Sequence, residues 1–95
     1  MNKANITDEK LKGLELARRL YEIGGKITRG DKHRACEVFG SGPEEPLHPK
    51  TVERYTSGKI EDLKDEDFAR DLLAYLERCH ETRMKMVEYL KTSLV

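Results

Sequence analysis

The sequence contains no tryptophan, only two cysteines and three prolines, and aromatic residues make up just 6% of its 95 residues. The longest apolar run, residues 72–76, is far shorter than the roughly 20 residues that a membrane-spanning helix needs. Residues 1–10 contain no apolar stretch typical of a secretory signal. We therefore expect one cytoplasmic domain, residues 1–95, with reduced thiols and no membrane partner.

The chain also has no formal net charge, because 18 basic residues balance 18 acidic ones. This balance excludes the simplest signature of a nucleic-acid-binding domain, a strongly basic composition. The charges are nevertheless unevenly spread. Residues 26–34 hold four basic residues against Asp31, whereas residues 61–67 hold five acids against one lysine. This uneven spread is compatible with a local basic face. With 38% charged residues, a merely solvated face is an equally good interpretation of the same pattern.

Signals of catalysis and of metal binding are weak. There is no glycine-rich phosphate loop after a strand and no nucleophile elbow, so we expect no enzyme activity and no cofactor. His33 and Cys36 have a spacing that could bind a metal, and Cys79 and His80 could add two ligands. Adjacent residues on a helix point about 100° apart, however, so the second pair would not face one ion. We expect no metal site.

Helical spacing of apolar residues recurs along the chain, and strand-like alternation is absent. A first helix is predicted from Asp8 to Ile23, ended by Gly24-Gly25. A second is predicted from about Asp31, as its N-cap, to Phe39. We expect both to pack through apolar stripes in an all-α fold.

Residues 41–46 contain two prolines and a glycine and are predicted to form a loop. His48-Pro49 then opens a third helix that ends at Ser57-Gly58. A long fourth helix is predicted from about Phe68 to Lys91, capped by Asp65 or Asp67. The expected fold is a four- to five-helix bundle with a long C-terminal helix in residues 65–92.

The third helix carries a recognisable order of residue types. Leu47, Thr51-Val52, Arg54-Tyr55 and Ser57-Gly58-Lys59 resemble the recognition helix of bacterial helix-turn-helix proteins of the lambda-repressor-like and LacI-like kind. Residues 32–40 are similar to the first helix of that motif. Cys36 and Gly40 take the places of its small crossing residue and its turn glycine. Residues 41–46 are an apparent six-residue insertion in the turn.

The resemblance implies a helix-turn-helix core in residues 8–64 and a sequence-specific DNA-binding protein. Such a protein would be a transcription regulator, such as a repressor, of bacterial, phage or mobile-element origin. Val52 and Tyr55, three residues apart, would face inward and leave a polar face for the major groove. The predicted base contacts are His48, Lys50, Glu53 and Arg54. The predicted phosphate contacts are Lys32, His33, Thr51 and Lys59. In the alternative interpretation, this is an ordinary helical bundle whose Val52 and Tyr55 are only core residues.

The fourth helix has an apolar stripe at heptad-like spacing. Because repressors of this kind usually bind two related half-sites as a two-fold dimer, we expect a homodimer on double-stranded DNA. The predicted dimer contacts are Leu72, Tyr75, Cys79, Met86 and Tyr89. Two alternatives stay open for this stripe. It could be intramolecular core, or it could bind another protein, in which case the chain is a helical adaptor.

Overall fold

The computed structural model describes residues 8–42 and 44–93, with side-chain surroundings from Lys12 onward. Within these ranges the chain forms α1 (Asp8–Gly24), α2 (Arg29–Val38), α3 (Pro49–Tyr55) and α4 (Glu66–Ser93), with a 3-10 turn η1 (Ile60–Asp62) before α4. The described part of the chain contains no β-strand. The predicted all-α fold with a long C-terminal helix is therefore confirmed. None of the described helices is long and apolar enough to cross a membrane.

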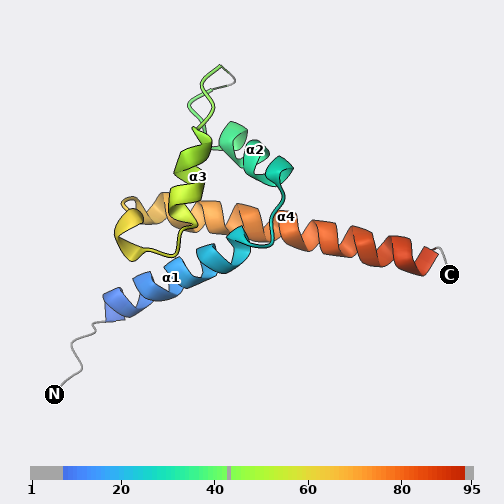
Figure 1. Ribbon diagram of the computed structural model, residues 1–95, viewed down its shortest axis with the longest axis horizontal. Coiled ribbons are helices and arrows are strands. Elements are labelled where there is room, and N and C mark those ends of the chain that lie inside the picture. Colours follow the sequence, from blue (N-terminus) through green and yellow to red (C-terminus); the bar gives the residue numbers. More distant parts are fainter. Residues whose placement is uncertain (1–7, 43, 94–95) are drawn as a thin grey trace.

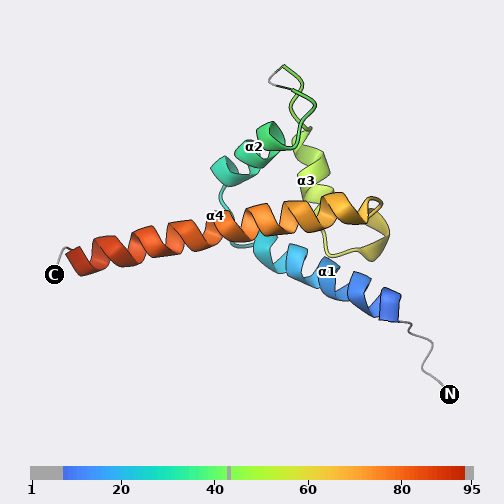
Figure 2. The same ribbon diagram turned by 180° about the vertical axis from the view of Figure 1, so that it is seen from behind.

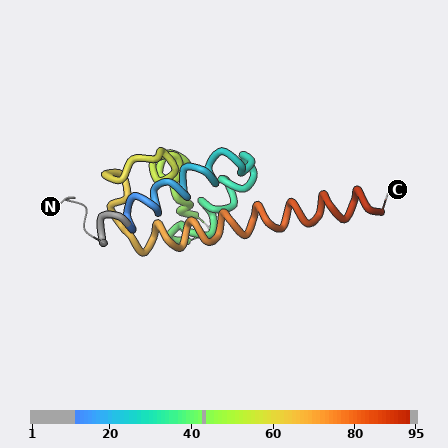
Figure 3. Tube along the Cα trace, turned by 90° about the horizontal axis from the view of Figure 1, so that it is seen from below, coloured from blue at the N-terminus to red at the C-terminus, as the bar shows by residue number. Residues whose placement is uncertain are grey.

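The helices are arranged around the first half of α4 (Figure 1). In that view α1 runs below this half, and α2 and α3 lie above it, with their connecting loop at the far tip. Figure 2 shows the same arrangement from behind. In Figure 3 the second half of α4 extends alone beyond the other helices. The radius of gyration, 16.0 Å, exceeds the about 12 Å expected for a compact domain of this length, in agreement with the projecting helix.

The hydrophobic core forms where α1, α2 and α3 meet the first half of α4. Its buried members are Leu16, Leu20, Ile23, Ala35, Tyr55, Ala69, Leu72, Leu73 and Leu76. Three edge-to-face aromatic pairs extend it, because Phe68 packs on Tyr55 and Phe39, and Phe39 also packs on Tyr75. Aromatic pairs of this geometry add to the stabilisation that comes from buried area. The core therefore fixes α2 and α3 on one side of α4.

The N-terminus of α4 is tied to α3 by one acidic residue. The Asp65 carboxylate accepts a hydrogen bond from the Phe68 N–H at 3.1 Å, as an N-cap does. The Asp65 N–H in turn donates to the hydroxyl of Tyr55 at 3.1 Å. The prediction that Asp65 or Asp67 caps this helix is thus confirmed for Asp65. The contact also holds the end of α3 against α4.

The start of α2 differs from the sequence prediction. Thr28, not Asp31, is the N-cap, and the helix begins at Arg29. Thr28 and Asp31 form a reciprocal capping box: the Asp31 N–H donates to Thr28 Oγ1 at 3.1 Å, and the Thr28 N–H donates to Asp31 Oδ2 at 3.0 Å. The prediction of Asp31 as N-cap was wrong. The helix starts earlier, and Asp31 occupies its third position, where an acidic residue completes the capping box.

Candidate nucleic-acid interface

The short helix α3 has a buried side and an exposed side. Val52 has no exposed surface and Tyr55 is buried, as their spacing predicted. The helix is opened by His48, whose Nδ1 accepts a hydrogen bond from the Lys50 N–H at 3.1 Å, and by Pro49 at the first helical position. Only Nε2 of His48 then remains available to an outside partner. The inward packing of Val52 and Tyr55 fixes which side of α3 faces solvent.

All four predicted base-contacting residues lie on exposed positions of α3 or its cap. His48, Lys50, Glu53 and Arg54 are each exposed. Glu53 approaches the ammonium of Lys32 at 3.9 Å, which is a weak surface pair. Lys50 and Arg54 make no ion pair within the described residues, so their charges are available to an outside partner.

The predicted phosphate-contacting residues are spread over three elements. Lys32 is half-buried and His33 is exposed on α2, Thr51 is half-buried on α3, and Lys59 is exposed after α3. A hollow of about 400 Å³ between α2 and α3 brings Lys32 and His33 together with Arg29. The sequence prediction did not include Arg29 among the phosphate contacts, because it placed the N-cap of this helix at Asp31, three residues after the observed N-cap Thr28. With a helix beginning at residue 29, Arg29 lies three and four positions before Lys32 and His33 and so shares their face.

The loop between α2 and α3 leaves the helix pair and returns to the same place. The Leu47 N–H donates to the Cys36 carbonyl at 2.8 Å, and the Ser41 N–H donates to the Glu45 carbonyl at 3.0 Å. In the Schellman ending of a helix, the N–H two residues after the C-cap donates a hydrogen bond to the carbonyl five residues before it. At the end of α2 that donor would be the Ser41 N–H, but here the Leu47 N–H donates to the Cys36 carbonyl instead. Residues 41–46 are therefore an excursion whose removal would leave Gly40 beside Leu47.

Gly40 closes the base of this excursion. A Cβ at this position would lie 2.5 Å from the Glu45 carbonyl oxygen and 2.7 Å from Pro46 Cα, so the loop backbone at residues 45–46 would have to move. At Gly42, in the same excursion, a Cβ would meet nothing within 4 Å.

We therefore expect Gly40→Ala to lower the free energy of unfolding by about 1–3 kcal/mol, the cost typical of forced overpacking. Gly42→Ala should be neutral or slightly stabilising, since it restricts only the unfolded chain. Urea denaturation of the two variants measures the difference. Equal stabilities would contradict the close approach at Gly40.

A buried acidic residue joins α2 to α4. Asp31 is 1% exposed, and its carboxylate accepts hydrogen bonds from Arg34 on its own helix, at 3.0 Å, and from Arg83 of α4. Burial alone would raise the pKa of Asp31, but the hydrogen bonds from the Thr28 N–H, Arg83 and Arg34 outweigh it and lower that pKa to about 2. The carboxylate therefore stays charged and holds α2 in place on α4.

The stripe predicted to form a dimer contact is divided by the fold. Leu72 is fully buried in the core of its own chain, so its prediction as a dimer contact is wrong. Tyr75 is half-buried, with its ring 5.7 Å from that of Phe39. Of the remaining predicted contacts, Cys79 is half-buried, and Met86 and Tyr89 are 60% and 71% exposed. Only the second half of α4 presents this stripe to solvent.

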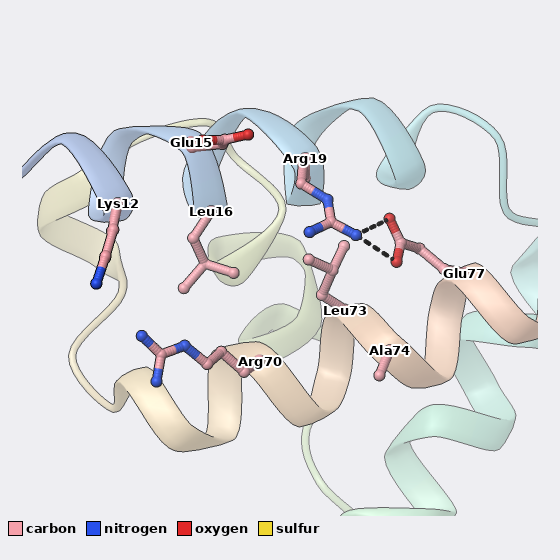
Figure 4. Close-up of a pocket in the computed structure, with 8 residues that line it drawn as sticks. All are labelled: Lys12, Glu15, Leu16, Arg19, Arg70, Leu73, Ala74 and Glu77. Atoms are coloured by element: carbon pink, nitrogen blue, oxygen red, sulfur yellow. Dashed lines mark hydrogen bonds and ion pairs between the residues drawn. The ribbon is translucent and has the colours of Figure 1, made fainter.

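A second hollow, of about 440 Å³, lies between α1 and α4 (Figure 4). Its cations Lys12, Arg19 and Arg70 lie near two acids, and Arg19 Nη2 donates to both carboxylate oxygens of Glu77 at 2.8 and 2.9 Å. This partly exposed pair links the two helices and contributes at most about 1 kcal/mol.

Among the described residues, no group of three or more His, Cys, Asp or Glu could hold a metal ion. Burial raises the pKa of the Cys36 thiol, which favours its neutral form beneath the helix pair.

Comparisons of the chain with protein-family models, with curated proteins and with solved structures find no match. A functional interpretation therefore depends on the residues and their geometry.

Proposed function

We propose that this chain is a sequence-specific DNA-binding protein that places the outer side of α3 in the major groove of a duplex. The observation that carries the proposal is the division of α3 into a buried side, Val52 and Tyr55, and an exposed side, on which Lys50 and Arg54 form no ion pair with any residue that the structure describes. A single helix fits the major groove, where cationic side chains can bond the acceptor edge of guanine.

The surroundings of α3 support the same role. Arg29, Lys32 and His33 gather beside its N-terminus, where they could contact phosphates of one strand, and Thr51 and Lys59 could contact phosphates farther along. His48, Lys50, Glu53 and Arg54 would face base edges. The acidic residues of segment 61–67 follow α3 in the chain and begin α4, at the end of the molecule away from the excursion (Figure 1). This separation of charge favours one orientation on a polyanion.

The excursion does not argue against this role. The Leu47–Cys36 hydrogen bond joins the last turn of α2 directly to the residue before the N-cap of α3. On this proposal the chain is a cytoplasmic transcription regulator. Leu72 is buried in the core of its own chain and so takes no part in a homodimer, which leaves Cys79, Met86 and Tyr89 as the predicted dimer contacts that an outside partner can reach. The exposed apolar residues of α4 favour a second candidate function, that of a helical adaptor for another protein.

The salt dependence of binding to a labelled random-sequence duplex tests the proposal. We expect a Kd on the order of 10⁻⁴–10⁻⁶ M at physiological salt, and a fall in log affinity with log salt of about 0.9 for each phosphate neutralised. Lys50→Ala and Arg54→Ala should each weaken binding and make this slope shallower by up to about 1. Fluorescence anisotropy over a salt series measures both quantities.

Lys91→Ala is the matched control, because Lys91 is an exposed lysine in the last turn of α4, far from α3 (Figure 1). It should leave the affinity and the slope unchanged. Absent binding, or a slope insensitive to Lys50 and Arg54, would reject the DNA-binding proposal and favour the adaptor.

A further inference from the structure

A long groove runs along the projecting half of α4. Its inner part, about 540 Å³, lies between α2 and α4, and its outer part, about 440 Å³, lies along α4. The two parts share Thr82, Met86 and Leu90 and so form one continuous depression, the arginine-rimmed groove. Met86 and Leu90 are 60% and 55% exposed, and no described residue of α4 after Leu76 is buried. Side chains of this kind gathered on one face of a helix indicate a surface that a partner covers.

The rim of the groove is strongly basic. Arg34, Arg78, Arg83 and Lys85 line it, and the only acid among the lining residues is Asp31. Asp31 is buried and already bonded to two of these arginines, so it offers nothing to an incoming cation. Arg78 makes no ion pair within the described residues, and Nη1 of Arg83 has no hydrogen-bond partner there. The rim therefore favours an occupant with acidic groups beside an apolar surface.

The length of the groove limits what can fill it. From Tyr75 to Leu90 the groove follows 16 residues of helix, whose 15 rises of 1.5 Å span about 22 Å. A small anionic molecule would cover only part of this distance. A helix of about four turns, with apolar residues at three- and four-residue steps, would cover all of it.

We propose that the arginine-rimmed groove binds an acidic amphipathic helix of a partner protein. The apolar face of that helix packs on Met86, Val87 and Leu90, and its flanking carboxylates pair with Arg34, Arg78 and Lys85. A second copy of this chain fits the groove poorly, because its own α4 would bring Arg78, Arg83 and Lys85 against the same cations. The inference does not depend on the DNA-binding proposal, because α3 takes no part in the groove.

The test uses the full chain and a labelled synthetic peptide of about 18 residues, with leucine along one helical face and glutamate beside it. A matched peptide carries lysine in place of every glutamate. We expect the acidic peptide to bind at least about tenfold more tightly than the basic one, as measured by fluorescence anisotropy. Arg78→Glu should reduce this preference by weakening binding of the acidic peptide and strengthening that of the basic one.

Met86 and Met84 provide a matched pair of variants. Met86 lines the groove, whereas Met84, 51% exposed, is not among its lining residues. Met86→Glu should lower affinity for the acidic peptide at least about tenfold, and Met84→Glu should leave it unchanged. Because both residues are exposed, both variants should keep the thermal melting curve of the original protein.

Four outcomes would overturn the proposal. They are equal affinity for the two peptides, equal effects of Met86→Glu and Met84→Glu, a dimer in sedimentation that Met86→Glu dissociates, and cosedimentation with phosphatidylserine vesicles that depends on Met86. The third would assign the groove to a second copy of the chain, and the fourth to a lipid surface.

Discussion

Replacing Val52 by aspartate is expected to unfold the protein. Val52 has no exposed surface, so a carboxylate in its place would be buried without a partner. The substitution removes about 1.5–3 kcal/mol of hydrophobic stabilisation and adds several kcal/mol of uncompensated burial of charge. A domain of this size has only about 5–15 kcal/mol in total. Circular dichroism should therefore show loss of most helical signal and of the cooperative thermal transition.

Lys50→Asp is the matched control for this experiment. Lys50 is exposed in the first turn of α3, where a negative charge interacts favourably with the helix dipole. Its stability should stay within about 0.5 kcal/mol of the original protein. If Val52→Asp melted at the same temperature as Lys50→Asp, the assignment of buried and exposed sides of α3 would be wrong, and the DNA-binding proposal would lose its basis.

Asp31→Asn is expected to destabilise the protein strongly, although the two side chains have nearly the same shape. It removes a buried carboxylate that accepts hydrogen bonds from Thr28, Arg34 and Arg83, and leaves Arg83 without its ion-pair partner. Breaking a buried ion pair from one side costs about 3 kcal/mol or more. Urea denaturation should show this loss, whereas Glu37→Gln, at an exposed acid of the same helix, should cost less than about 0.5 kcal/mol.

The original protein and Asp31→Asn should also differ in how their stability responds to acid. The pKa of Asp31 is about 2 in the folded protein and 3.8 as the usual value. A lowered pKa contributes stability that is complete above the unfolded value and is lost as pH falls through the folded value. The difference in unfolding free energy between the original protein and Asp31→Asn should therefore shrink by about 2 kcal/mol between about pH 6 and about pH 2. A constant difference over this range would show that the carboxylate is not stabilised by its charge.

Periodicity and capping residues were enough to predict the helices, because these signals are local. The apolar spacing in residues 8–23 and the Pro49 start of α3 both correspond to observed elements. The role of Asp31 was missed for the opposite reason. Its partner Arg83 is 52 residues away in sequence, and nothing local indicates that these two side chains meet. The start of α2 was misplaced because Asp31 fits an N-cap as well as it fits a capping box.

The sequence predicted the exposed and buried residues of the candidate site where the spacing along one helix determines them. It predicted them less well where burial depends on which other helices pack against that helix. Val52 and Tyr55 were correctly placed inside, which also left Lys50 and Arg54 outside. On α4, by contrast, one stripe runs from Leu72 to Tyr89, and its spacing does not tell which half the other helices cover. Only the tertiary arrangement assigns the first half to the core and the second half to the surface.

The closed base of the 41–46 excursion makes this loop a natural place to attach foreign sequence. Its two ends are held together by the Leu47–Cys36 and Ser41–Glu45 hydrogen bonds, so a longer insert would add loop entropy without pulling α2 from α3. An epitope or a fluorescent reporter placed beside Glu44 should therefore be tolerated, and it would mark the end of the molecule nearest to His48.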